Sequence, residues 1–559
     1  MRPGPLLARM ALLGFYIVLL AGFVPQARAQ ATGGMSASLQ QALAGAPDLH
    51  HRDFPQGLDM LRAVYAKRGF LPIWLESGTP TVQARRLAQA LRDAGAHGLD
   101  PADYDADWID AQIRELLAAP DAREARWAAL DLRLSSAALR YVMHLHYGRV
   151  DPRAGGFNLP VPRADLDPIE TVDRLAGADD TAAVLAAIEP HFHHYRLLEA
   201  ALAKYRRLAP DDGLTALPPL GARSIRPGER YSGAKALRRL LAALGDLGSD
   251  APAASRDRTL DSDLVAALRS FQERHGLVAD GVLGKHTYAA LTVPLARRVR
   301  QIELTLERWR WLPAFETPPI VVNIPAFRLY AFRTTEDHES DMLRMDVIVG
   351  RSFPETQTPV FMAQMKHVVF WPYWDVPDSI VQREMLPQIR AKPAFLTRNH
   401  LELVSGRRDD SPVVPSTRKN IKALATGAVR LRQQPGPDNA LGAIKFVFPN
   451  VHSVYLHSTP DKRLFKESSR AFSHGCIRVG DPVALAAHVL RNAEGDWNAE
   501  KIDLAMKGEP NQRVALSKPI QVMILYGTVM AMESGRVQFF EDIYGYDQKL
   551  EELLQLRNK

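Results

Sequence analysis

The chain has 559 residues, of which 46% are hydrophobic and 24% are charged, and its formal net charge is +7. This composition is typical of globular proteins and excludes a disordered or fibrous chain. Because the length exceeds that at which a single hydrophobic core keeps growing, we expect two to four domains. The 70 basic and 63 acidic residues are spread along the chain. Without a helix-turn-helix, zinc-ligand or aromatic RNA motif, this mild charge predicts no binding to nucleic acid.

The first 29 residues, 1–29, have the pattern of a secretory signal peptide. Basic residues precede an apolar run at 10–24, and the small-x-small site Ala27-Arg28-Ala29 follows. This order predicts export and cleavage after Ala29. The apolar run is shorter than the roughly 20 residues that span a bilayer, so cleavage is favoured over retention as an inner-membrane anchor. Residues 30–51 are small and polar and are predicted to be a linker.

Residues 52–225 carry the spacing of amphipathic helices. Leucine and alanine recur at intervals of three and four residues, which predicts a mostly helical domain. Gly98, Pro101 and Pro120 mark breaks between its helices. Several histidines here lack an acidic or cysteine ligand at a familiar spacing, so we interpret them as surface or core residues and predict no metal site. They are His144, His146, His191, His193 and His194.

A smaller helical module is predicted at residues 230–295. It follows a stretch rich in proline, glycine and arginine at 217–233, and leucines line one face of its predicted helices. Between the helices, the glycines of the segment 276–284 supply turns, and Asp280 can bond its own turn backbone. A basic helical connector then leads to the next region.

Residues 315–510 change from the period of helices to the period of strands. Short runs rich in β-branched and aromatic residues are bounded by proline, glycine, asparagine or aspartate. They lie at 320–324, 328–332, 345–349, 367–370 and 445–448. A polar stretch with many prolines, about 377–428, interrupts this β-rich domain and is predicted to be an inserted subdomain or a mobile lid. Residues 511–559 are expected to pack on the domain as a C-terminal segment.

Cys476 is the only cysteine of the chain. An exported protein usually pairs its cysteines, so a lone thiol is retained when chemistry requires it or burial protects it. A thiol attacks a carbonyl well only as the thiolate, and neutral imidazole is the side chain whose pKa suits proton removal near pH 7. The general base is therefore expected to be His457 or His474.

The sequence does not choose between the two histidines. His474 precedes Cys476 by two residues and would share its face on an extended segment, but a bend at Gly475 can redirect either side chain. His457 lies nineteen positions upstream at the end of an alternating run. Gly475 also lets a substrate backbone approach the sulfur and lets neighbouring amides turn toward an oxyanion.

His457, eighteen intervening residues and then Ser473-His474-Gly475-Cys476-Ile477-Arg478 resemble the signature of the L,D-transpeptidase catalytic domain, also called the YkuD domain. Residues 230–295 resemble a peptidoglycan-binding domain. The domain order resembles the large L,D-transpeptidases of Gram-negative envelopes. The resemblance implies a multi-domain α+β protein with a helical scaffold domain, a helical peptidoglycan-binding module and a β-rich catalytic domain with an insertion.

The resemblance also implies roles for the residues of the motif. Cys476 would be the nucleophile and His457 the general base. Ser473 and Gly475 would shape the acyl site and oxyanion hole. Large relatives often have aspartate after the base histidine and Ser-Ser-Gly-Cys at the nucleophile, so the auxiliary role of His474 stays open. The residues implied to contact substrate or line the cleft are Arg478, Tyr455 and Trp374.

The implied reaction is formation of 3-3 crosslinks between peptidoglycan stem peptides in the periplasm, through a thioester on Cys476 and without cofactor or metal. Carbapenem β-lactams would acylate the same thiol, and residues 230–295 would bind glycan. Same-fold alternatives are an L,D-carboxypeptidase or endopeptidase and a lipoprotein-to-wall ligase. A papain-like protease would need an asparagine or aspartate partner and a cysteine at a helix start. A non-catalytic wall-binding protein is disfavoured by the presence of Cys476, His457 and Gly475.

Overall fold

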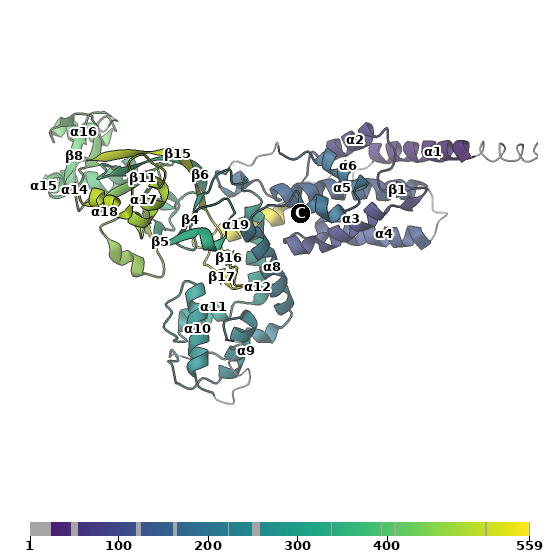
Figure 1. Cartoon of the computed structure of the whole chain (residues 1–559), viewed down its shortest axis with the longest axis horizontal. Helices are drawn as coiled ribbons and strands as arrows, with labels where there is room; N and C mark the ends of the chain where they lie inside the picture. Colours follow the sequence, from purple (N-terminus) through teal and green to yellow (C-terminus); the bar gives the residue numbers. More distant parts are fainter. Residues whose placement is uncertain are drawn as a thin grey trace, which may run out of the picture.

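The computed structural model has a helical region, a small helical module and a β-rich domain (Figure 1). The residues that it describes are 24–45, 54–118, 124–159, 165–221, 223–248, 258–336, 338–392, 394–406, 408, 410–508 and 511–557. The predicted multi-domain α+β class is confirmed. Residues 1–23 of the predicted signal peptide lie outside the described residues. Within the described ranges, no helix has both the length and the apolar character needed to cross a membrane.

The helical region is built around the long helix α5 (Glu124–Tyr147), which is buried along most of its length. Its neighbours contribute amphipathic faces to one shared core, as the leucine and alanine spacing predicts. A two-stranded hairpin of β1 (Leu75–Glu76) and β2 (Thr79–Pro80) joins this region. The surrounding helices are α2 (Gly57–Lys67), α3 (Val82–Arg92), α4 (Ala106–Ala118), α6 (Pro168–Gly177) and α7 (Thr181–Ala186).

The predicted linker at 30–51 is wrong for most of its length. Helix α1 (Val24–Ala44) covers it as far as residue 44 and packs against α5. Met35, Leu39 and Leu43 recur every four residues and are buried in the scaffold core. Three apolar side chains at this spacing give one helical face enough contact, although the residues between them are small and polar.

The small helical module joins the rest of the chain through two long helices. Helix α8 (His193–Leu208) leads toward it, α12 (Leu295–Trp309) leads away, and the two pack against each other (Figure 1). The predicted leucine faces are buried in a common core. The helices of the module are α9 (Ala234–Leu244), α10 (Ser262–Arg274) and α11 (Lys285–Leu291).

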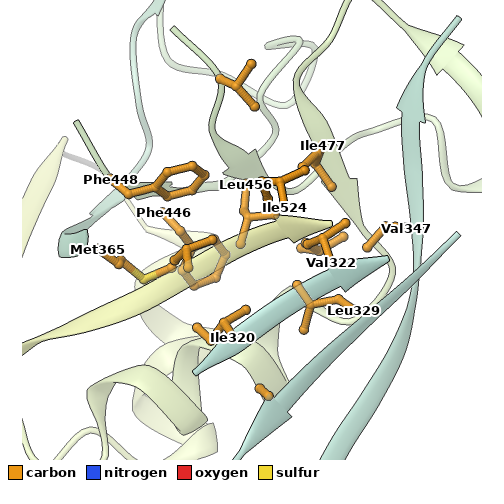
Figure 2. Packing of buried hydrophobic residues seen from close by; sticks show 14 of the residues in the cluster. Ile320, Val322, Leu329, Val347, Met365, Phe446, Phe448, Leu456, Ile477 and Ile524 are labelled. Carbon is orange, nitrogen blue, oxygen red and sulfur yellow. The ribbon is translucent and has the colours of Figure 1, made fainter. Parts of the chain in front are cut away.

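The β-rich domain is one nine-stranded sheet in the order β13-β5-β14-β12-β11-β6-β15-β3-β4. Strand β4 also pairs with β5, so the sheet closes on itself around an apolar core (Figure 2). The five runs that alternation predicted all lie in or beside strands. The strands are β3 (Ile320–Asn323), β4 (Arg328–Phe332), β5 (Met342–Gly350), β6 (Phe361–Phe370), β11 (Ile444–Val447), β12 (Leu456–His457), β13 (Ala471–Ser473), β14 (Ile477–Val479) and β15 (Gln512–Leu525).

We expected residues 511–559 to pack on the catalytic domain as a C-terminal segment, and the first of them also supply a strand of its sheet. Strand β15 lies between β6 and β3. Its first half is largely exposed and its register shifts between Ala515 and Ile520, so its sequence lacks a clean alternation. Beyond it, a hairpin of β16 (Val529–Ala531) and β17 (Val537–Phe539) packs in the core of the small module, and α19 (Tyr546–Arg557) contacts α12.

The insertion predicted at about 377–428 is a subdomain with its own apolar core. Strands β7 (Trp374–Asp375) and β10 (Arg430–Gln433) flank it and belong to its sheet, whose order is β7-β10-β8-β9. It lies at the end of the molecule farthest from the helical region (Figure 1). Its other elements are α13 (Asp378–Ile380), η8 (Val381–Met385), α14 (Leu386–Ala391), α15 (Ala394–Arg398), β8 (Leu401–Val404), β9 (Val413–Val414) and α16 (Arg418–Ala425). Two later helices, α17 (Pro482–Leu490) and α18 (Ala499–Lys507), pack on the core of the β-rich domain.

Candidate active site

Two short parallel strands carry the predicted catalytic residues. In the pairing of β12 with β14, Leu456 lies beside Ile477 and His457 beside Arg478. Side chains alternate between the faces of a strand. Leu456 and Ile477 point into the apolar core, so His457 and Arg478 point to the opposite face. Cys476 precedes Ile477, whose amide donates to the Tyr455 carbonyl, and the same alternation directs Cys476 and Tyr455 to that face.

His457 is held in one tautomer. Its Nδ1 lies 2.6 Å from the carbonyl oxygen of Ser458, an atom that only accepts, so Nδ1 carries the proton and donates. Nε2 then has a lone pair available for a proton. Burial lowers the pKa of His457 to about 3, and the charges of Arg478 and Lys445 contribute to this shift. The imidazole is therefore neutral at ordinary pH.

Cys476 is partly exposed, and its Sγ lies 3.7 Å from the carbonyl oxygen of Ser453. Burial raises the pKa of the thiol, while a backbone hydrogen bond from Tyr455 and the charges of Lys445 and Arg478 act in the opposite direction. The resting site thus favours a neutral thiol on the same face as a neutral imidazole.

Lys445 supplies a positive charge that the sequence reasoning did not assign to the site. It lies opposite His457 in the pairing of β11 with β12, and its Nζ lies 3.9 Å from the centre of the Tyr455 ring. A cation over an aromatic face is attracted by the ring quadrupole. The alternation of residues 444–447 puts Lys445 on one face, but only the strand register identifies that face as the one with the thiol.

The loop before Cys476 is shaped by Gly475 and Ser473. Gly475 has φ +113°, a left-handed region that favours glycine. A Cβ at this position would meet ordinary contacts at 3.5 Å, so backbone conformation requires the glycine. The Ser473 hydroxyl donates to the Cys476 carbonyl at 2.6 Å and accepts the Gly475 amide at 3.1 Å. The Gly475 amide is therefore already bonded within the loop.

Two hydroxyls behind this loop, one on the buried Thr358 and one on the partly buried Tyr544, were missed by the sequence reasoning. Thr358 Oγ1 donates to the Gly475 carbonyl at 2.9 Å and accepts the Gly350 amide at 2.8 Å. Tyr544 Oη donates to the Gly350 carbonyl at 2.6 Å and accepts the Thr358 amide at 3.2 Å. Together they fix the loop to the end of β5. These contacts join positions far apart in the chain, so a single sequence gives little signal for them.

His474 is directed to the insertion. Its Nε2 lies 2.7 Å from Glu384 Oε1 on η8, a π-helical turn. The preceding residue of that turn, Arg383, pairs with Glu355 in the loop after β5. The structure thus brings His457 to the face of Cys476 and joins His474 to a different partner.

The two other residues expected at the cleft belong to different sheets, with Arg478 on β14 and Trp374 on β7. Burial lowers the pKa of Arg478, and Asp461 offsets part of that shift. Trp374 lies on β7 and packs against the core of the insertion. Its neighbour Asp375 is close enough to contribute to the raised pKa of Tyr455, whose first cause is burial. The insertion therefore borders the site.

Comparisons with known proteins agree with this architecture. Residues 318–509 match the L,D-transpeptidase catalytic domain, YkuD. Residues 59–202 match a domain described as "Scaffold domain", and residues 230–291 match the "Putative peptidoglycan binding domain". A Haemophilus influenzae protein described as "Putative L,D-transpeptidase" is 30% identical over 253 residues, which are 45% of this chain and 49% of that protein.

The chain therefore has an acyltransferase domain of the YkuD type, combined with a scaffold domain and a peptidoglycan-binding domain. Residues 318–509 are thus similar to L,D-transpeptidase catalytic domains, and the chain is similar to a protein described as a putative L,D-transpeptidase. The matched region spans about half the length of the curated relative.

Proposed function

We propose that the protein is a periplasmic peptidoglycan L,D-transpeptidase that forms 3-3 crosslinks between stem peptides through a thioester on Cys476. The observation that carries the proposal is the parallel pairing of β12 with β14, which directs His457 and Cys476 to one face. The hydrogen bond from His457 to the Ser458 carbonyl supports it further, because it leaves Nε2 ready to accept a proton. The match of residues 318–509 to the family supplies the reaction class.

The first half-reaction transfers the acyl group of a donor tetrapeptide to sulfur. Cys476 Sγ attacks the carbonyl carbon of the third stem residue, usually meso-diaminopimelate, while its proton passes to His457 Nε2. The carbon–sulfur bond forms, and the carbon–nitrogen bond to the terminal D-alanine breaks. The imidazolium gives the proton to the departing amine. The product is a thioester, which retains the energy of the cleaved bond, so no nucleotide is consumed.

The second half-reaction moves the acyl group to the side-chain amine of diaminopimelate on another stem. This nitrogen attacks the thioester carbonyl, its proton passes to His457, and the thiol is restored. The cations Lys445 and Arg478 favour the anionic character that develops in both steps. Because burial raises the pKa of the thiol and lowers that of His457, these charges are expected to matter most while the proton is in transfer.

Incubation of the purified protein with tetrapeptide-rich sacculi, followed by mass analysis of muropeptides, tests the proposal. The expected products are 3-3 crosslinked dimers and free D-alanine, absent with Cys476→Ala. Tripeptides without crosslinks would identify a carboxypeptidase, loss of existing 3-3 links an endopeptidase, and attachment of a lipoprotein a ligase. No change of muropeptides by the folded wild-type protein would leave a non-catalytic wall-binding protein and overturn the proposal.

Carbapenem acylation gives an independent test of the thiol. We expect intact-protein mass to rise by one inhibitor on the wild type and to stay unchanged on Cys476→Ala. An equal adduct on both proteins would contradict a thioester at Cys476. Sedimentation with sacculi separately tests whether the protein binds glycan through residues 230–295. Because this binding would not depend on the catalytic thiol, Cys476→Ala should sediment like the wild type.

A further inference from the structure

Three side chains from distant segments meet beside the start of α8, away from Cys476. His193 is the first residue of α8, His338 lies between β4 and β5, and Glu533 lies in the turn of the β16–β17 hairpin. Glu533 Oε1 is 3.2 Å from His193 Nε2 and 3.0 Å from His338 Nδ1. The centres of the two imidazole rings are 4.2 Å apart.

We propose that His193, His338 and Glu533 form a binding site for Zn²⁺ or a similar divalent transition metal. One ligand atom from each residue lies within 4.8 Å of the other two. Zinc bonds of about 2.0 Å in tetrahedral geometry separate neighbouring ligand atoms by roughly 3.3 Å. The two carboxylate-to-imidazole distances are close to that spacing. Two imidazoles and one carboxylate are also the donor types that zinc accepts, with water in the fourth position.

The loops that carry the cluster are tied to each other, which prepares the ligands for a metal. The Glu339 amide donates to Glu533 Oε1 at 3.1 Å, and the Glu533 amide donates to Glu339 Oε1 at 2.7 Å. Hydrogen bonds of this kind orient metal ligands and strengthen binding. Within the described residues, no arginine or lysine forms an ion pair with Glu533.

A second cluster of similar composition differs because an arginine is paired with its carboxylates. His97, Glu189 and Glu199 also bring three ligand atoms together. There, however, Arg196 lies 2.7 Å from Glu189 and 3.8 Å from Glu199. A fixed guanidinium already balances the carboxylates and would repel a metal ion. The proposal is therefore restricted to the cluster at Glu533.

The proposed metal would connect three parts of the chain. His193 belongs to the helix that leads to the small module, His338 follows strand β4 of the β-rich domain, and Glu533 belongs to the C-terminal hairpin. Strand β5 begins beside this cluster, and its other end, at Gly350, contacts Thr358 behind the thiol loop. The site is thus structural and separate from the transpeptidation proposed above, which uses no metal.

Titration of tag-free, chelator-treated full chain with ZnCl₂ tests the proposal, with bound metal counted by elemental analysis. We expect one equivalent to bind, and at least ~10-fold weaker binding in His338→Ala and Glu533→Gln. His286→Ala, at an exposed position of α11, is the matched control and should bind like wild type. Cys476→Ala should also bind normally, which excludes metal held by the thiol.

Thermal unfolding distinguishes a true ligand change from a folding defect. Zinc should raise the melting temperature of wild type, His286→Ala and Cys476→Ala, because it binds the folded state, and should not raise that of the two ligand variants. Co²⁺ should give visible absorption bands of a tetrahedral site in the same set of proteins. The proposal is overturned if the folded wild type binds no zinc, or if both ligand variants bind it as tightly as the wild type.

Discussion

His457 and Cys476 share one face of the catalytic sheet because Leu456, which precedes His457, pairs with Ile477, which follows Cys476, in the parallel register of β12 and β14. His457 lies nineteen positions before Cys476 in the chain, whereas His474 lies only two positions before Cys476. Strand pairing overrides that difference in distance along the chain. The same register adds Lys445 from the neighbouring antiparallel strand.

Replacement of the thiol by a hydroxyl should nearly abolish activity. A serine hydroxyl is a weaker nucleophile than a thiol and needs a stronger base than a histidine whose pKa is lowered to about 3. We expect Cys476→Ser to reduce crosslinking by about 10³-fold or more. The partly exposed position should leave folding intact, which circular dichroism checks. Activity within tenfold of wild type would contradict a thioester mechanism.

The two histidines of the motif should behave differently when each is replaced by glutamine. His457→Gln removes the proton acceptor and should lower the acylation rate by about 10²- to 10⁴-fold. His474→Gln, the matched control, keeps a polar group toward Glu384 and should lower it only a few-fold. Stopped-flow measurement of carbapenem acylation compares them. Equal losses in the two variants, or a larger loss in His474→Gln, would contradict the assignment of His457 as the general base.

The pH profile of acylation should have widely separated limbs. The base is neutral above its pKa of about 3, so the rate should fall only in strong acid. Burial raises the thiol pKa. The acylation rate should therefore increase a second time, as the thiolate forms, only above the ordinary thiol pKa of about 8.5. A half-maximal rate near pH 6.5 would contradict the buried neutral imidazole.

Lys445→Met should move both limbs of this profile to higher pH. The lysine charge lowers the pKa of His457 and of Cys476, and its removal relaxes both shifts. Rates of carbapenem acylation measured across pH check the displacement. Lys285→Met, at an exposed position of α11, is the control and should leave the profile unchanged.

The hydroxyl of Thr358 should be required for activity although it is buried behind the loop. Thr358→Val leaves the Gly350 amide and the Gly475 carbonyl without this partner, at a cost of about 1–3 kcal/mol for an unpaired buried group. Because small displacements of reacting groups reduce rates strongly, we expect kcat to fall at least ~10-fold with little change in KM.

A conservative variant separates positioning of the loop from general stability. Thr358→Ser retains the hydroxyl and should restore kcat to within a few-fold of wild type, although it loses a buried methyl. Tyr544→Phe, which removes the second hydroxyl, should resemble Thr358→Val. If serine and valine at position 358 have the same kcat, the hydroxyl does not position the loop.

Local sequence patterns predicted most of the architecture. Leucine spacing predicted the helices of both helical regions, and alternation predicted β3, β4, β5, β6 and β11, because each pattern reports one buried face. The patterns failed where few apolar residues mark the buried face. Among the residues of α1 whose burial is described, 34–44, the buried ones are Met35, Leu39 and Leu43, and the first half of β15 is largely exposed.

The site was predictable only in part. The motif singled out Cys476 and the two histidines, but strand register and loop contacts decide which groups meet them. Lys445 joins the face through pairing with β12. Thr358 bonds the loop from 117 positions away along the chain, and Tyr544 holds the Thr358 amide from 186 positions away. The partner of His474 lies in an insertion 90 residues upstream. None of these relationships follows from local periodicity.

The position of β15 has a consequence for biogenesis. Synthesis proceeds from the N-terminal end, so β6 and β3 are available long before the strand that joins them. The nine-stranded sheet is completed only when the residues of β15, 512–525, have been added. A chain clipped before residue 512 would thus carry every residue of the motif and still lack the strand between β6 and β3.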